Sequence, residues 1–207
     1  MHRHMGEETE SLSVNDGLFL LNAVRDVILS YVREKSWVEK PDSFPLSLTR
    51  AQGVFVSIVE KAAGETGEQE KYILSIGNPL PSVSLIDTAF SGATKTAIDL
   101  SCNPSANSVL LKSVLRIDLI GDLDLVEVAN PMKYVELVTV GRDGLMVERG
   151  HCKGVLLPGV ATAERWTVQD FLSQCCMRAG LMADAWLQNA ARIYRFQTQV
   201  FEGKLEN

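Results

Sequence analysis

The sequence is poor in the residues that most often carry metal and nucleophilic chemistry. Its 207 residues include 4 cysteines and 3 histidines, and two of the histidines, His2 and His4, lie in the polar segment that begins the chain. No C-x-x-C pair occurs, and Cys175 and Cys176 are adjacent, so the ligand spacing of a structural zinc site is absent. We therefore expect four reduced thiols, as in a cytoplasmic protein, with no metal and no cofactor.

Long hydrophobic runs and an excess of basic residues are also missing. No segment approaches the roughly 18 apolar residues of a membrane span, and residues 1–10 lack the apolar stretch of a secretory signal. Lysine and arginine number 20 against 26 aspartates and glutamates, a formal net charge of −6, whereas a nucleic-acid-binding surface needs a basic footprint. We expect a soluble, cytoplasmic, acidic protein with no membrane partner and no nucleic-acid partner.

Catalytic and nucleotide-binding motifs are absent as well. The chain contains no G-x-S-x-G, H-E-x-x-H, G-x-x-x-x-G-K-[ST] or G-x-G-x-x-G, which excludes the best-marked hydrolase, metalloprotease and nucleotide-binding classes. Carboxylate pairs occur at Asp122 with Asp124 and at Asp143 with Glu148. Because an acidic chain produces such pairs by chance, we expect most of these side chains on the solvated surface.

The composition that remains is that of a folded protein, 46% hydrophobic and 22% charged. Apolar spacing predicts helices over about 16–35, 82–100 and 167–180, and strands over 54–59, 71–77, 115–119, 155–157 and 194–201. We expect 62–70 to be a long hairpin loop, 102–107 a polar connection, and 138–140 and 145–147 two strands joined at Gly141-Arg142-Asp143-Gly144. The fold class is therefore α+β, a mostly antiparallel or mixed sheet with about three main helices.

An ordered series of short pieces in the second half of the chain is similar to a known family. The pieces are Gly141-Arg142-Asp143-Gly144-Leu145, Gly150, Gly154 before Leu156-Leu157-Pro158, Trp166, Phe171-Leu172, Ala179-Gly180-Leu181 and Trp186. In this order they resemble the AMMECR-one domain family, named for the Alport syndrome, midface hypoplasia and elliptocytosis chromosomal region. The resemblance covers about residues 15–202 and is weaker before Leu115.

This resemblance implies a single domain over residues 13–203, one compact unit of two unequal lobes with a cleft, after a frayed tail at 1–12. It also implies a place in small gene sets with a Memo-type protein and a radical S-adenosylmethionine enzyme, either of which is then an expected partner. The residues expected to line the binding cleft are Ile73, Ser75, Gly77, Asp99, Gly154, Leu157 and Pro158.

The most characteristic family segment, Leu-Arg-Gly-Cys-Ile-Gly, is changed in this chain to Tyr72-Ile73-Leu74-Ser75-Ile76-Gly77. An isoleucine cannot replace the five-donor fork of an arginine, and a serine hydroxyl needs an adjacent base to act as a nucleophile. We therefore expect a non-catalytic binding or accessory module. The alternatives are an enzyme with altered cleft chemistry, using Ser75, His151 or Cys152, and a nucleic-acid-associated factor.

Overall fold

The chain divides into two compact units, each described by itself. The computed structural model describes residues 11–64, 67–188 and 190–206. One unit is formed by the residues up to Ile120 together with those from Gln199 onward, and the other by Gly121–Thr198. No helix within these described ranges is long and apolar enough to cross a membrane. Of the tail expected at 1–12, residues 1–10 lie outside the described residues, whereas Leu12 is buried and exchanges two hydrogen bonds with the Gln199 side chain.

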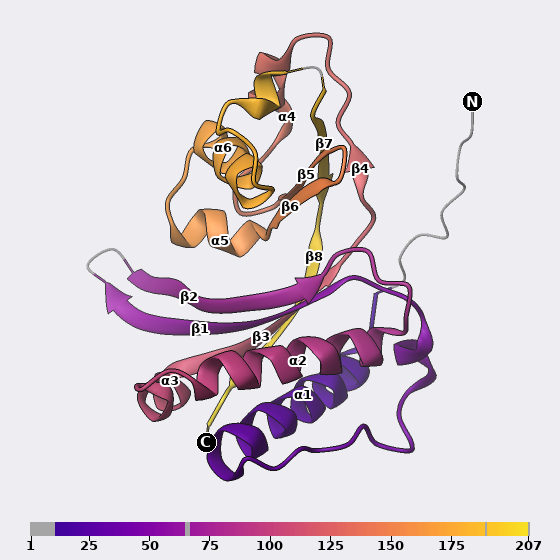
Figure 1. Cartoon of the computed structure of the whole chain (residues 1–207), viewed down its shortest axis with the longest axis vertical. Coiled ribbons are helices and arrows are strands. Elements are labelled where there is room, and N and C mark those ends of the chain that lie inside the picture. The colour runs from indigo at the N-terminus through magenta and orange to yellow at the C-terminus, as the bar shows by residue number, and fades with distance from the viewer. Residues whose placement is uncertain (1–10, 65–66, 189, 207) are drawn as a thin grey trace. The chain divides into compact units, whose positions relative to one another are not determined.

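The first unit is a four-stranded sheet with two long helices on one face (Figure 1). The strand order is β2-β1-β3-β8, and β1 runs antiparallel to both β2 and β3. The elements are α1 Val14–Glu34, a 3₁₀ turn Leu46–Thr49, β1 Val54–Gly64, β2 Gly67–Asn78, α2 Leu85–Ser101, α3 Ala106–Lys112, β3 Ser113–Ile120 and β8 Thr198–Lys204.

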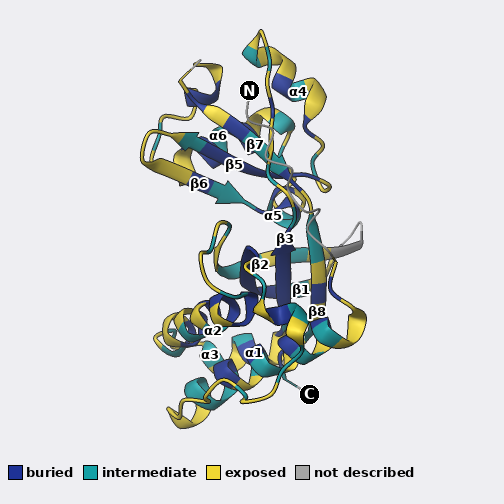
Figure 2. Cartoon of the chain, turned by 90° about the vertical axis from the view of Figure 1, so that its right-hand side faces the viewer, coloured by how far each residue is buried: buried dark blue, intermediate teal, exposed yellow. Residues whose placement is uncertain are grey.

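Strand periodicity determines which side chains face the helices. Val54, Val56 and Ile58 of β1 join Leu115, Ile117 and Leu119 of β3 in the apolar core beneath α1 and α2. Strand β3 is buried along almost its whole length (Figure 2). The intervening residues of β1 and β3 point to the opposite face of the sheet, and several of them are polar. The two helices begin at serine caps, where Ser13 and Ser84 accept hydrogen bonds from backbone N–H groups.

The second unit is a smaller antiparallel sheet with α6 packed on it (Figure 1). Its strand order is β4-β7-β5-β6. The elements are β4 Asp124–Leu125, a 3₁₀ turn Pro131–Lys133, α4 Tyr134–Leu137, β5 Gly144–Arg149, β6 Cys152–Leu156, α5 Pro158–Ala163, α6 Val168–Arg178, a 3₁₀ turn Ala185–Leu187 and β7 Arg192–Phe196. Phe171 and Cys175 of α6 pack against Leu145 and Ile193 in the core. Helix α6 begins at a capping box formed by Thr167 and Asp170.

The predicted α+β class is confirmed, but four local predictions are wrong. The 62–70 segment is not a long loop, because β1 continues to Gly64 and β2 begins at Gly67. Cross-strand pairs of opposite charge, Glu60 with Lys71 and Lys61 with Glu70, extend the ladder there. The connection at 102–107 contains the start of α3, a seven-residue helix whose Leu110 is buried in the core.

The other two corrections concern the second unit. Residues 138–140 do not form a strand. Thr139 lies in a compact turn, in which its backbone N–H and carbonyl both form hydrogen bonds with Asp143. The predicted last strand, 194–201, is two strands in different sheets, β7 and β8, separated at Gln197. Alternation of apolar residues continues through both strands, so the periodicity carries no signal of the change of sheet. All four cysteines are free thiols, as expected.

Candidate functional site

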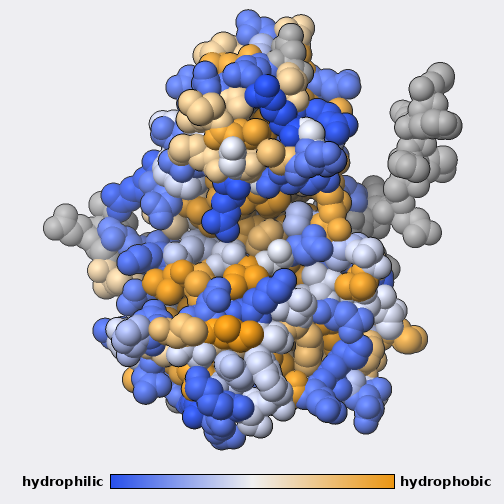
Figure 3. Space-filling model, viewed as in Figure 1, coloured by the Kyte–Doolittle hydropathy of each residue, from blue (hydrophilic) through white to orange (hydrophobic). Residues whose placement is uncertain are grey.

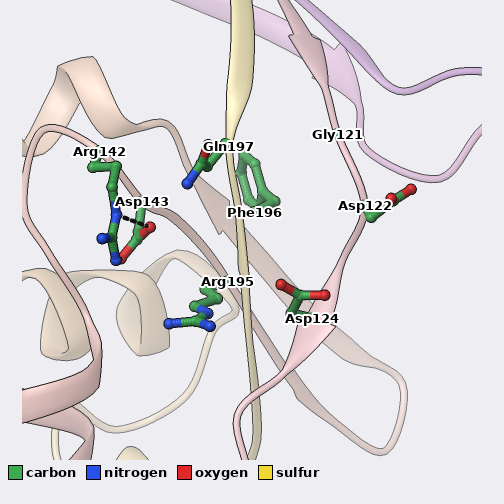
Figure 4. Close-up of a pocket in the computed structure, with 8 residues that line it drawn as sticks. All are labelled: Gly121, Asp122, Asp124, Arg142, Asp143, Arg195, Phe196 and Gln197. Carbon is green, nitrogen blue, oxygen red and sulfur yellow. Dashed lines mark hydrogen bonds and ion pairs between the residues drawn. The ribbon is translucent and has the colours of Figure 1, made fainter. Parts of the chain in front are cut away.

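A pocket of about 340 Å³ opens in the second unit, where β4 and β7 approach the turn that precedes β5 (Figure 4). Its lining residues are Gly121, Asp122, Asp124, Arg142, Asp143, Arg195, Phe196 and Gln197. Small-molecule sites usually enclose about 300 to 1,000 Å³. The volume therefore suits a small metabolite better than a large cofactor.

The turn at the pocket is held together by one aspartate. The backbone N–H of Asp143 donates to the carbonyl of Thr139 at 2.9 Å, and the Asp143 carboxylate accepts the Thr139 N–H at 2.8 Å. Gly141 has φ +85°, a left-handed conformation that glycine adopts without the steric cost of a Cβ. The Gly-Arg-Asp-Gly sequence thus forms a closed turn, and the arginine side chain of this turn lines the pocket.

Asp143 also fixes the direction of the Arg142 guanidinium. Nε of Arg142 donates to one carboxylate oxygen at 2.9 Å and Nη2 donates to the other at 2.8 Å. Asp143 is 2% exposed, whereas the Arg142 side chain is 52% exposed. Burial alone would raise the pKa of Asp143, but the hydrogen bonds from Arg142 and Thr139 lower it overall. Asp143 therefore stays ionised, and Nη1 of Arg142 has no partner in the part of the chain that the structure describes.

A second arginine reaches the pocket from β7. Arg195 Nη1 donates to the carbonyl of Leu137 at 3.1 Å, which orients the side chain and leaves other N–H groups available. Phe196, next along the strand, is buried and packs over Gly144, where an added Cβ would come 2.4 Å from the ring. The pocket therefore combines two guanidinium groups with an aromatic wall.

The lining residues suit the binding of a charged ligand. Guanidinium groups hold carboxylates and phosphates with directed, charge-assisted hydrogen bonds. The eight lining residues include no serine, cysteine, histidine or lysine, so the pocket presents no hydroxyl, thiol, imidazole or amine nucleophile. Within the described ranges, no group of three histidine, cysteine or carboxylate side chains is placed to hold a metal ion.

Four of the residues expected to line the cleft lie in the first unit. Ile73 sits at a β-bulge and packs against the helix-facing core, and Asp99 is exposed near the end of α2. Ser75 accepts a hydrogen bond from the Ser57 hydroxyl at 3.0 Å. Gly77 lies so close to β1 that a Cβ would come 2.1 Å from the carbonyl oxygen of Val54.

The other three, and the remaining catalytic candidates, lie in the second unit. Gly154 is buried on β6 under the end of α6, and Leu157 and Pro158 are buried at the start of α5. His151 is exposed in the turn between β5 and β6, and Cys152 is exposed as the first residue of β6. That these seven cleft residues form one binding site stays a prediction.

Ser75 belongs to a row of polar side chains on the sheet face opposite the helices. Ser57 is the cross-strand partner of both Ser75 and Arg116, so the three residues lie side by side across β2, β1 and β3. Arg116 binds Glu70 through two hydrogen bonds of 2.8 and 2.6 Å, and Glu202 through Nε at 2.8 Å. Sequence analysis missed this network because its members are separated by up to 141 residues.

The two cations and two carboxylates of the network balance and pair with one another. Lys61 adds ion pairs to Glu70 and Glu202, and Tyr72 accepts a hydrogen bond from Arg116 at 2.6 Å. Burial, with Asp118 nearby, raises the pKa of Tyr72 to about 12, so its hydroxyl stays protonated at neutral pH. Arg116 is therefore occupied by structural partners.

The AMMECR1 family model matches residues 21–201. The chain belongs to the AMMECR1 family. The resemblance read from the Gly-Arg-Asp-Gly-Leu series and the pieces after it is thereby confirmed, and those first four residues form the turn beside the pocket.

Relatives of similar length come from archaea. The chain is 33% identical over 193 residues to a protein of Thermofilum pendens, covering 92% of this chain and 91% of that one. It is 32% identical over 195 residues to Protein MJ0810 of Methanocaldococcus jannaschii, covering 92% of each. The crystal structure of the uncharacterized protein PH0010 from Pyrococcus horikoshii superposes with a TM-score of 0.77 at 28% identity, over 93% of this chain and 94% of that one.

In this AMMECR1 family member, the sequence predicted the turn at Gly141–Gly144 but not that this turn lies beside a pocket. Most of the paired carboxylates were expected on the solvated surface, but Asp143 is an exception, since it is buried beneath Arg142. An aspartate directly after an arginine, between two glycines, was the available signal. Arg195 carried no comparable signal, because only the pairing of β7 with β5 brings it toward the turn.

Proposed function

We propose that this chain is a non-catalytic binding or accessory module whose second-unit pocket holds a small molecule by an anionic group. The observation that carries the proposal is the Arg142–Asp143 clamp. A buried carboxylate holds the guanidinium by Nε and Nη2 and leaves Nη1 at the pocket. A guanidinium fixed in advance loses less side-chain entropy when a ligand binds.

The geometry around the nucleophile candidates favours binding over catalysis. Ser75 has a second serine hydroxyl, Ser57, as its hydrogen-bond partner, and a hydroxyl cannot accept the proton of a nucleophilic serine as a base would. His151 and Cys152 are exposed at a hairpin turn and do not line the pocket. An altered enzyme would need a base for one of these groups.

The distribution of hydrophobic residues on the surface favours binding of a small ligand over docking of a protein as the primary function. On the face shown in Figure 3, hydrophobic residues of the first unit alternate with hydrophilic ones, and such scattered residues are ordinary protein surface. The family analogy adds an accessory role toward a Memo-type or radical S-adenosylmethionine protein. A cytoplasmic location is part of this proposal, and the four free thiols, two of them exposed, support it.

Replacing Arg195 by glutamine tests the proposed anion site. We expect R195Q to weaken the binding of acetate and of inorganic phosphate about tenfold, since a hydrogen bond to a charged group contributes about 1.5–3 kcal/mol. The measurement is a titration of amide chemical shifts by NMR. In the unsubstituted protein the shifts should concentrate at Gly121, Arg142, Asp143 and Gln197, which line the pocket.

The matched control is R178Q, which removes an exposed arginine from the last turn of α6, outside the pocket. R178Q should bind both anions as the unsubstituted protein does. Equal losses in R195Q and R178Q would mean that overall charge, and not the pocket, attracts the anions. The proposal would then be wrong.

A further inference from the structure

The pocket has a negative side as well as a positive one. Asp124 of β4 is the cross-strand partner of Arg195 of β7, so the two side chains lie on the same face of neighbouring strands. Figure 4 shows the Asp124 carboxylate on the opposite side of β7 from Arg142 and its clamp. Asp122, which also lines the pocket, directs its carboxylate away from both arginines in that view.

Asp124 and Arg195 do not neutralise each other. Opposite charges at paired positions of two strands normally attract and form an ion pair. Here the Arg195 guanidinium extends to the carbonyl of Leu137 instead. Among the residues that the structure describes, Asp124 makes no ion pair and no hydrogen bond through its carboxylate. The Asp124 carboxylate and the Arg195 guanidinium are therefore both available to charged groups of a ligand.

We propose that the ligand of this pocket is a small zwitterion of the amino-acid class, a point that rests on the proposed function above. Its carboxylate binds the Arg142 and Arg195 guanidinium groups, and its ammonium group binds the Asp124 carboxylate. A simple anion meets Arg195 and an Arg142 that is already paired with Asp143, and it is repelled by Asp124. A zwitterion meets an opposite charge at each end. The volume of about 340 Å³ limits the ligand to a small molecule.

Matched pairs of acids test the inference, because each pair differs only by an amine. The probes are glycine with acetate, β-alanine with propionate, and 4-aminobutyrate with butyrate, titrated by NMR. We expect at least one amino acid to bind about fivefold more tightly than its partner, the contribution of one solvent-exposed ion pair. D124N should abolish this preference and leave the binding of the simple acid unchanged or slightly tighter. E127Q, which removes an exposed carboxylate outside the pocket, should keep the preference.

The outcomes separate this inference from the proposed function. If every simple acid binds as tightly as its amino acid and R195Q weakens both, the anion site stands and the zwitterion inference is wrong. A preference for the amine that survives in D124N also overturns it, since Asp124 is then not the ammonium site. If neither the acids of the panel nor inorganic phosphate shift the pocket amides, both proposals fail.

Discussion

Alanine at position 154 is expected to lower the free energy of unfolding by about 3 kcal/mol, the upper end of the usual cost of overpacking. Gly154 lies on β6 against the end of α6. A Cβ there would come 2.4 Å from the backbone nitrogen of Ala179 and 2.6 Å from the carbonyl oxygen of Cys175. Backbone atoms cannot move aside as a flexible side chain can, so strand and helix must separate. Urea denaturation of G154A, followed by circular dichroism, measures the loss.

The matched variant is G150A. Gly150 has φ +61°, but an added Cβ would meet no atom within 4 Å. Its cost should therefore be backbone strain alone, about 1 kcal/mol. If the two variants lose equal stability, the close approach of β6 to α6 is not what position 154 requires. A larger loss in G154A than in G150A would mean that packing alone explains the glycine at position 154, which the family resemblance had assigned to the binding cleft.

The fold was predictable where one element carries its own signal. Helix α1 was expected at about 16–35 and runs over Val14–Glu34, because Leu21, Val24 and Ile28 repeat at helical spacing and Ser13 caps the start. The change of sheet at Gln197 was not predictable. Arg195 pairs with β4 and β5, whereas β8 adds to β3, and strand partners are set by residues far away in the chain.

The candidate site was predictable only as a motif. The Gly141–Gly144 turn was part of the resemblance, yet which of its side chains would be buried depended on tertiary packing. Asp143 is buried because the Thr139 N–H and the Arg142 guanidinium both satisfy it. Asp124 belongs to the carboxylates that were expected mostly on the solvated surface, and it is exposed. Its position opposite Arg195 required the register of a two-residue strand, which periodicity cannot give.

Arg116 makes hydrogen bonds and ion pairs across the sheet of the first unit. This side chain on β3 reaches Glu70 on β2 and Glu202 on β8, so it links both edge strands of the sheet to its centre. The Arg116 side chain is 10% exposed and each glutamate is 26% exposed. Removing one partner of a fully buried ion pair costs about 3–5 kcal/mol, because the other charge is left without compensation. Partial exposure of the glutamates reduces that figure.

We expect R116Q to lower the free energy of unfolding at pH 7 by about 2 kcal/mol, a value between those of exposed and buried pairs. The pH dependence identifies the cause. The hydrogen bonds from Arg116 hold the pKa of Glu70 below its ordinary value of 4.5, so this stabilisation is present above the pKa of the unfolded chain and is lost as pH falls through the folded value. The gap between R116Q and the unsubstituted protein should therefore narrow below about pH 4. R116K, which keeps the charge without the planar fork, should lose less at pH 7. A gap that stayed constant from pH 7 to about pH 3 would show that Arg116 acts by packing and not through its carboxylates.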